Sequence, residues 1–102
     1  MRMVILIGLL VTLSACKKEP AAPLPVGNFF VDNANCTTPC FVHCYDQSYN
    51  AVAWKWNFGN SLTSDKQQDS IQYHTPGFYT ISLTVWNSDN VSDSLSKTIQ
   101  VY

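Results

Sequence analysis

Charge is scarce in this chain, and basic charge is especially scarce. Only 13% of its 102 residues are charged, with six Lys and Arg against seven Asp and Glu. A nucleic-acid binder holds its partner with a basic face, so this balance excludes that class of protein. An acidic disordered chain is excluded as well. Disorder requires low hydrophobicity and high net charge, whereas here 46% of residues are hydrophobic and the net charge is −1.

The sequence also lacks helical periodicity and enzyme motifs. No stretch repeats its apolar residues with the period of an α-helix. There is no nucleophile elbow, no His-Glu-x-x-His and no phosphate-binding loop. The two histidines, His43 and His74, lie in separate segments, where solvated side chains are expected. We therefore predict a protein that is not an enzyme and that uses no metal and no cofactor.

The apolar run near the N-terminus is too short to cross a membrane. It extends from Val4 to Leu13 and follows one basic residue, Arg2. As a helix, residues 3–15 would reach about 20 Å, against about 30 Å of hydrocarbon in a bilayer. A basic start, a short apolar run and small residues before the cut are typical of an export signal. We predict a signal peptide over residues 1–15.

Residues 13–16, Leu-Ser-Ala-Cys, resemble the lipobox of bacterial lipoproteins at all four positions. The resemblance implies cleavage after Ala15 and lipidation of Cys16, whose acyl chains would anchor the protein to a membrane. Lys17 follows the cysteine, where an Asp would favour retention at the inner membrane. The outer membrane is therefore the expected location. Simple secretion, with Cys16 as an ordinary thiol, is the alternative.

A proline-rich segment separates Cys16 from the rest of the chain. Residues 17–27 contain three prolines, which preclude a regular helix or a central strand. An extended proline-rich chain rises about 3.1 Å per residue, so this segment reaches roughly 30 Å. We predict a tether over residues 16–27 and one folded domain over residues 28–102.

From residue 28 onward, apolar residues alternate with polar ones. The clearest runs cover residues 52–58 and 79–85. Such alternation indicates strands with one buried face. Segments rich in turn residues, such as 46–50 and 87–90, separate the runs. Short strands divided by turns predict a β-sandwich or a β-barrel.

Two segments resemble the sequence blocks of PKD domains. Residues 54–60 read Trp-Lys-Trp-Asn-Phe-Gly-Asn, against Tyr-x-Trp-Asp-Phe-Gly-Asp-Gly in the family. Residues 73–87 resemble the second block, Tyr-x-x-Pro-Gly-x-Tyr-x-Val-x-Leu-x-Val-x-Asn. The resemblance implies an all-β, immunoglobulin-like sandwich of about seven strands. The positions that form its core signature are Trp54, Trp56, Phe58, Gly59, Tyr73, Pro76, Gly77 and Tyr79.

Trp56 is expected at the centre of this sandwich, as a buried tryptophan is in immunoglobulin domains. Asn57 and Asn60 stand where the family carries acidic residues. Calcium sites require carboxylates, so no metal is expected at this turn. Residues 61–69 are expected to form a long polar loop.

Three cysteines follow Cys16, and export permits disulfides. Cys40 and Cys44 are four residues apart in one expected strand, about 13 Å, which is too far for a disulfide. Cys36 and Cys40 span an expected turn, and similar Cys-x-x-Pro-Cys turns occur in related bacterial domains. We predict the Cys36–Cys40 disulfide, which leaves Cys44 as a small buried hydrophobic residue. A Cys36–Cys44 disulfide is the alternative.

Several aromatic residues are expected on the outer surface. Phe78 and Trp86 fall on the face opposite to the apolar residues of the run 79–85, so they form the candidate binding surface. Exposed Phe and Trp are typical of binding sites and of surfaces beneath sugar rings. Packing across the strands of a solvated sheet is the alternative. Phe41 and Tyr45 are expected to join the same outer sheet as Phe78 and Trp86.

Two short motifs indicate a covalent modification. Asp69-Ser70-Ile71 and Asp93-Ser94-Leu95 resemble the Asp-Ser/Thr-aliphatic O-glycosylation motif of some Gram-negative bacteria. Ser70 and Ser94 are therefore candidate O-glycosylation sites.

Together these features predict a small envelope lipoprotein with one binding domain. PKD domains usually mediate contacts with proteins or carbohydrates outside the cell, so the resemblance implies a non-catalytic binding module. The expected partners are an envelope or surface protein or a polysaccharide, besides the membrane that Cys16 engages through its lipid. The alternative is a structural or assembly factor of the envelope that pairs its sheet edge with a partner protein.

Overall fold

The alternation of apolar and polar residues produces two layers of antiparallel strands. The computed structural model describes residues 21–102, which contain seven strands. Within this range no helix is long and apolar enough to cross a membrane. The predicted signal peptide over residues 1–15 and the predicted lipidation site Cys16 lie outside the described residues.

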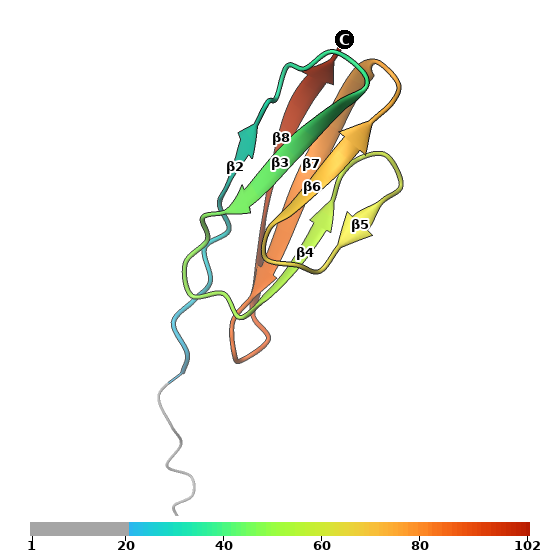
Figure 1. Ribbon diagram of the computed structural model, residues 1–102. Coiled ribbons are helices and arrows are strands. Elements are labelled where there is room, and N and C mark those ends of the chain that lie inside the picture. Colours follow the sequence, from blue (N-terminus) through green and yellow to red (C-terminus); the bar gives the residue numbers. More distant parts are fainter. Residues whose placement is uncertain (1–20) are drawn as a thin grey trace, which may run out of the picture.

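The strands form a three-stranded sheet in the order β2-β3-β6 and a four-stranded sheet in the order β5-β4-β7-β8. Neighbouring strands are antiparallel in both sheets. The two sheets pack face to face (Figure 1), so the predicted all-β, immunoglobulin-like sandwich is confirmed. The strand bounds are β2 Phe29–Asp32, β3 Cys40–Asp46, β4 Ala53–Asn57, β5 Thr63–Ser64, β6 Asp69–Tyr73, β7 Gly77–Trp86 and β8 Ser92–Val101.

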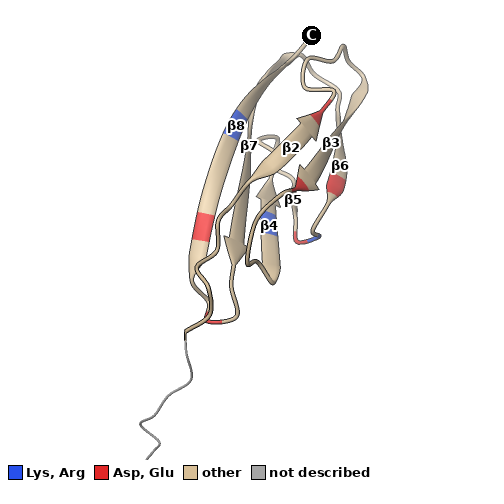
Figure 2. Cartoon of the chain, turned by 90° about the vertical axis from the view of Figure 1, so that its left-hand side faces the viewer, with Lys and Arg blue, Asp and Glu red and all other residues tan. Residues whose placement is uncertain are grey.

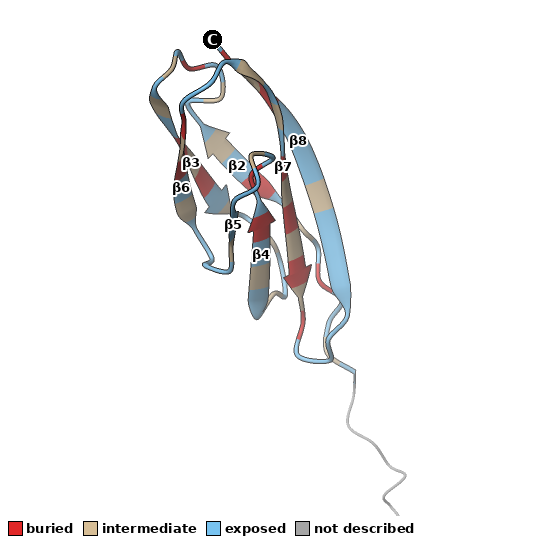
Figure 3. Cartoon of the chain, turned by 90° about the vertical axis from the view of Figure 1, so that its right-hand side faces the viewer, coloured by how far each residue is buried: buried red, intermediate tan, exposed pale blue. Residues whose placement is uncertain are grey.

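Trp56 fills the centre of the core between the two sheets. Its side chain is fully buried, with the edge-to-face ring of Phe29 at 5.2 Å and the parallel ring of Phe58 at 6.2 Å. The indole N–H donates a hydrogen bond of 2.9 Å to the carbonyl of Lys66, so burial leaves no unpaired polar group. The buried segments of the strands face this core, whereas β8 is largely exposed (Figure 3).

Tyr73 and Tyr79 close the core at the end of the sandwich where β7 begins. Their rings lie 4.3 Å apart, and the Tyr73 hydroxyl donates to the carbonyl of Phe58 at 2.7 Å. That bond joins β6 of one sheet to the end of β4 in the other. The Tyr79 hydroxyl donates to the carbonyl of Thr75 at 2.6 Å and fixes the turn before β7. Tyr73 and Tyr79, two aromatic positions of the family signature, thus link separate segments through their hydroxyl groups.

Gly59 allows the turn after β4 to approach the backbone of β7 closely. Its φ is +78°, in the region that favours glycine, and a Cβ atom there would lie 2.7 Å from the carbonyl oxygen of Thr80. The chain therefore turns out of β4 directly over the middle of β7. A side chain at this position would push two central strands apart.

The region predicted as a long polar loop, residues 61–69, contains the short strand β5, so that part of the prediction is wrong. The backbone N–H of Phe58 donates to the carbonyl of Leu62 at 3.1 Å, and the Asn60 side chain accepts from the N–H of Leu62 at 3.2 Å. This turn returns the chain along β4, where Thr63 pairs with Asn57. The end of β4, at Trp56 and Asn57, is thereby covered.

The folded domain begins earlier than residue 28, the predicted boundary. The N–H of Ala22 donates to the Asp89 carboxylate at 2.9 Å, and the Asn87 side chain donates to the carbonyl of Pro23 at 3.0 Å. Val26 and Tyr49 bridge through two backbone hydrogen bonds of 3.0 and 2.9 Å. The proline-rich residues 22–27 are consequently part of the domain, because side chains of the β7–β8 turn hold their backbone.

We expect Gly59→Ala to lower the free energy of unfolding by more than 1 kcal/mol, roughly the cost of a side chain forced into strained backbone. Gly27→Ala is the matched control, because a Cβ atom there meets only ordinary contacts at 3.5 Å and beyond. Urea unfolding of both variants measures the difference. Equal stability of the two variants would contradict the close approach.

Candidate binding surface

The outward face of the three-stranded sheet carries a cluster of exposed aromatic side chains. The strand register sets them in rows, with Phe30 opposite Tyr45 and Asp32 opposite His43. On the other side of β3, His43 lies opposite Ser70. We call the outward side chains of these strands the aromatic face. They are Phe30, Asp32, Phe41, His43, Tyr45, Ser70 and Gln72.

Three rings of the aromatic face stack in sequence, Phe30 on Tyr45 and Tyr45 on His43. The ring centroids of Phe30 and Tyr45 lie 6.3 Å apart with an interplanar angle of 24°, and those of Tyr45 and His43 lie 6.5 Å apart at 29°. Phe41, four residues before Tyr45, lies about 14 Å further along β3. Phe30, Phe41 and Tyr45 are 49%, 54% and 40% exposed. Their ring surfaces are therefore available to a ligand.

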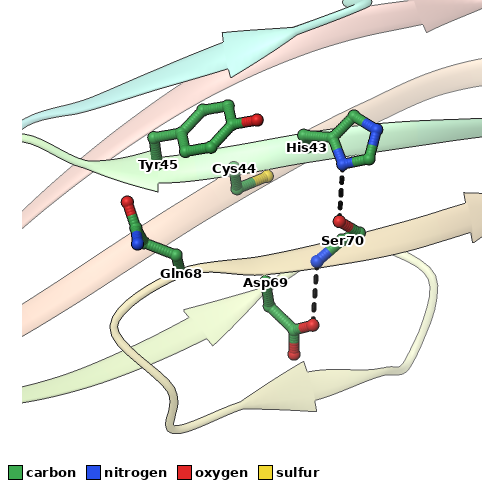
Figure 4. Close-up of a pocket in the computed structure, with 6 residues that line it drawn as sticks. All are labelled: His43, Cys44, Tyr45, Gln68, Asp69 and Ser70. Atoms are coloured by element: carbon green, nitrogen blue, oxygen red, sulfur yellow. Dashed lines mark hydrogen bonds between the residues drawn. The ribbon is translucent and has the colours of Figure 1, made fainter.

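A polar row lies between these aromatic positions. The Nδ1 atom of His43 and the Oγ atom of Ser70 are hydrogen-bonded at 2.6 Å, as Figure 4 shows. Asp32 stands at the opposite end of the same row. This polar row therefore presents a carboxylate, an imidazole and a hydroxyl. It lies about 7 Å along the strands from the aromatic side chains before and after it.

A hollow of about 260 Å³ adjoins the face where β6 begins. The Asp69 carboxylate accepts from the N–H of Ser70 at 2.8 Å. The pKa of Asp69 is lowered, chiefly by a hydrogen bond from the Ser64 hydroxyl, against the opposing effect of burial. Asp69 therefore carries a fixed negative charge at neutral pH. The side chains that line the hollow are His43, Cys44, Tyr45, Gln68, Asp69 and Ser70 (Figure 4).

The row of Asp32, His43 and Ser70 contains the residue types of a hydrolase triad but lacks its geometry. In a triad the carboxylate binds one imidazole nitrogen while the nucleophile binds the other. Here the Ser70 hydroxyl occupies Nδ1, and within residues 21–102 Asp32 makes no hydrogen bond to His43. Nor do three metal-binding side chains cluster anywhere in this part of the chain.

The outward face of the four-stranded sheet differs in character. Its Ser and Thr hydroxyls lie opposite one another on β7 and β8 and are already hydrogen-bonded across the strands. Hydroxyls bonded to each other have fewer free donors and acceptors for a ligand. The three pairs are Thr80–Thr98 at 3.1 Å, Ser82–Ser96 at 2.8 Å and Thr84–Ser94 at 2.8 Å.

Phe78 and Trp86 both lie on this second face, at opposite ends of β7. Phe41 and Tyr45 lie on β3 of the three-stranded sheet, so the prediction that they join the same outer sheet as Phe78 and Trp86 is wrong. Phe78 is 72% exposed as predicted, but Trp86 is half-buried, so the prediction that its ring is exposed is wrong. The reason is the neighbouring strands. Trp86 lies between Ala53 of β4 and Ser92 of β8, whereas Phe78 has a partner only on β8. The structure does not bring the two rings together.

The cysteines pair as predicted. Cys36 and Cys40 form a disulfide with a Cα–Cα distance of 6.1 Å, and the alternative Cys36–Cys44 is absent. A loop this short contributes about 2 kcal/mol in the chain-entropy estimate. Cys44 is a free, buried thiol in the core.

The candidate glycosylation sites lie on different sheets. Ser70 and Ser94 are both exposed, and their hydroxyls hydrogen-bond with His43 and Thr84. O-glycosylation of either serine stays a prediction.

Neither Phe30 nor the pairing of His43 with Ser70 was predicted from the sequence. The adjacent phenylalanines at 29 and 30 were a usable signal, because in a strand one of them must face outward. The hydrogen bond between His43 and Ser70 depends on which residues of β3 and β6 stand opposite each other, and the sequence alone does not give that register.

The profile of the PKD domain family matches residues 21–102. The chain belongs to the PKD domain family. PKD domains are immunoglobulin-like modules that are not themselves catalytic. The family boundary at residue 21 agrees with the contacts that join residues 22–27 to the sandwich.

Two similar proteins illustrate the range of this fold. A pre-pro-metalloprotease, PrtV of Vibrio cholerae, is 36% identical over 56 residues, which cover 55% of this chain and 6% of PrtV. The chain thus spans a small part of that relative's length. The first PKD domain of PrtV has a solved structure with a TM-score of 0.69 and 29% identity, covering 78% of this chain and 98% of the domain. A structure of carbohydrate-binding modules from a β-sandwich superfamily has a TM-score of 0.72 at 22% identity, covering 80% of this chain and 36% of that one, and shows similarity of fold.

We expect stability to fall above pH 9 because of Cys44. Burial, aided by the negative charge of Asp69, raises the pKa of its thiol from 9.0 to about 12. Between these values the unfolded chain loses a proton that the folded chain keeps, so the free energy of unfolding decreases as the pH rises. The slope from one such group reaches about 1.4 kcal/mol per pH unit.

Cys44→Ala removes this contribution, and urea unfolding at pH 8, 9 and 10 measures it. Burial also raises the pKa of Tyr73, which adds a fall in the same direction at higher pH in both proteins. The steeper decline of the wild type between pH 9 and 10 is the expected result. Parallel pH profiles of the two proteins would contradict it.

Proposed function

We propose that this chain is a non-catalytic binding module of the cell envelope that contacts carbohydrate through its aromatic face. The stacked and exposed row of Phe30, Tyr45 and His43 carries the proposal. Planar rings of this kind offer apolar surface for the C–H faces of sugar rings. The neighbouring row of Asp32, His43 and Ser70 supplies acceptors and donors for sugar hydroxyls.

The charges of the three-stranded sheet disfavour an anionic ligand. Its charged side chains are three aspartates, Asp32, Asp46 and Asp69, one on each strand (Figure 2). Of the three, only Asp32 belongs to the aromatic face, and that face carries no Lys or Arg. Binding must then rest on ring contacts and hydrogen bonds, which is the chemistry of sugar recognition. The fold similarity to carbohydrate-binding modules agrees with this proposal. The alternative is that the same rings contact a protein.

The envelope location belongs to the proposal and rests on residues 1–16. We propose that residues 1–15 are removed as a signal peptide and that Cys16 carries the lipid, with the outer membrane as the favoured site. The lipobox-like Leu-Ser-Ala-Cys sequence supports this assignment. The expected partners are then the membrane through this lipid, and a polysaccharide or a protein of the envelope or surface.

The alternative function is strand addition, in which a sheet edge pairs with a partner protein. The structure of β8 disfavours it at that edge. Lys97 stands on the inward side of this edge strand, opposite Ile81. Its Nζ atom lies 5.0 Å from the centre of the Phe29 ring and donates a hydrogen bond to the Phe29 carbonyl. An inward-pointing charge on an edge strand opposes pairing with another strand, because that pairing would bury it. This longest edge is therefore protected.

We expect Tyr45→Ala and Phe41→Ala to reduce retention on insoluble polysaccharide at least tenfold, which corresponds to about 1.4 kcal/mol. Co-sedimentation with peptidoglycan, chitin and cellulose measures retention. Both residues are exposed, so thermal stability should change by no more than about 0.5 kcal/mol. Phe78→Ala is the matched control, since it removes a still more exposed ring from the other sheet.

Two outcomes of this experiment would overturn the assignment of the surface. Loss of retention only with Phe78→Ala would move the binding site to the four-stranded sheet, as the sequence predicted. Absence of wild-type retention on all three polysaccharides, together with a specific protein captured by crosslinking through Tyr45, would replace carbohydrate with a protein partner.

We expect Cys16→Ala to release the protein from the membrane fraction. Without the thiol no acyl chain attaches, and within the described part of the chain no helix provides another anchor. Cell fractionation and the intact mass of the envelope protein test this. A wild-type mass equal to that of the unmodified polypeptide would contradict the lipid anchor.

A further inference from the structure

The end of the sandwich that receives the N-terminal segment is unusually apolar. Five large apolar side chains there are between 41% and 68% exposed. They come from three segments that are distant in the sequence: the proline-rich segment, the β3–β4 loop and the β7–β8 turn, all at the lower end in Figure 1. We call them the apolar end. They are Leu24, Val26, Tyr49, Val52 and Val91.

Hydrogen bonds hold these segments together. The Asn50 side chain donates to the carbonyl of Leu24 at 3.0 Å, and Val26 bridges to Tyr49. The N–H of Val52 donates to the carbonyl of Trp86 at 2.8 Å, next to the turn that carries Val91. The apolar end is thus a fixed feature of the fold and does not require rearrangement to meet a partner.

The proline-rich segment is fastened to the same end. The Asn87 side chain donates to the carbonyl of Pro23, and the N–H of Gly27 donates to the Asp93 carboxylate at 2.8 Å. The chain therefore enters the domain at the apolar end, at Ala22. This placement shortens the tether that the sequence suggested.

The remaining tether is short relative to the domain. Cys16 and Ala21 are five residues apart, which allows at most about 18 Å when fully extended. The ten residues of β7 extend about 34 Å from the apolar end to the opposite end. A lipid on Cys16 would therefore keep the apolar end beside the bilayer, whatever angle the domain adopts.

We propose that the apolar end seats on the bilayer surface into which the acyl chains of Cys16 insert. The proposal rests on the lipid anchor proposed above. Apolar side chains with a tyrosine among them suit the boundary between headgroups and acyl chains. The nearby carboxylates of Asp89 and Asp93 accept from the backbone at Ala22 and Gly27, so they are turned toward the domain.

Two further observations favour a lipid surface over a second copy of the chain. The anchor would hold the apolar end near the bilayer at a high effective concentration, so weak contacts suffice. The tether also carries Lys17 and Lys18 beside Glu19, and their net positive charge is attracted to anionic headgroups. In this orientation the long axis of the domain points away from the membrane. The aromatic face lies along its side and stays accessible.

Spin labelling of the lipidated full mature chain tests the seat. A nitroxide at Ser88→Cys reports on the exposed β7–β8 turn, and one at Thr75→Cys reports on the opposite end. Cys44 is buried, Cys36 and Cys40 form the disulfide, and the thiol of Cys16 carries the proposed lipid, so the new thiol is the one that reacts. The probe is a vesicle of phosphatidylethanolamine and phosphatidylglycerol at 3:1, and collision with a water-soluble nickel chelate is measured.

We expect nickel collisions at Ser88 to be at least threefold fewer than at Thr75 on vesicles. In a chain expressed from residue 17, which carries neither Cys16 nor its lipid, we expect equal collisions at the two sites in solution. A variant with Leu24→Ser, Tyr49→Ser and Val52→Ser should raise the Ser88 value to that of Thr75 while the protein still floats with the vesicles. If this triple variant does not fold, Val52→Ser alone, at an exposed position outside the strands, should raise the value in part.

The outcomes separate the two proposals. Flotation with equal collision rates at Ser88 and Thr75 would overturn the seat and leave the lipid anchor intact, as would a Ser88 value that the serine variants do not change. Spin–spin broadening between Ser88 labels would show pairing of two copies and overturn the seat in favour of self-association. Failure of the wild type to float, with an unmodified mass, would overturn the lipid anchor and the seat together.

Discussion

The burial of Trp56 between the two sheets is the constraint on which the rest of the structure depends. The ring needs a partner on each side, and Phe29 of one sheet and Phe58 at the end of β4 provide them. Its N–H needs an acceptor, and the carbonyl of Lys66 provides it. That requirement folds the chain back after β4, which creates β5 and brings β6 to the edge of the other sheet.

Once the inner faces are fixed, the outer faces are fixed as well, because side chains in a strand alternate. In the four-stranded sheet, alternation places Ser and Thr in pairs that satisfy one another. In the three-stranded sheet it places aromatic rings beside a polar row. The same core thus produces two different outer faces. On one, the hydroxyls are hydrogen-bonded to each other, and on the other, aromatic rings are exposed. The exposed rings make the second face the better candidate for ligand recognition.

The sequence predicted what depends on local pattern. Alternation and the two signature segments were enough for the sandwich and the central place of Trp56, and the Cys-x-x-Pro-Cys turn agreed with the disulfide. Features that depend on neighbours in space were missed. The half-burial of Trp86 follows from strands on both sides of it, and the attachment of residues 22–27 follows from Asn87 and Asp93, more than 60 residues away. The row of Phe30, Tyr45 and His43 required the strand register.

Recognition of the ligand by the aromatic face can be tested with amide NMR spectra of the ¹⁵N-labelled mature domain, titrated with chitotetraose and with soluble peptidoglycan fragments. We expect saturable shifts concentrated at Phe30, Phe41, His43, Tyr45 and Ser70, with β7 and β8 unchanged. Shifts confined to Phe78 and its neighbours on β8, or the absence of any shift with a sugar whose polymer retains the protein, would contradict it.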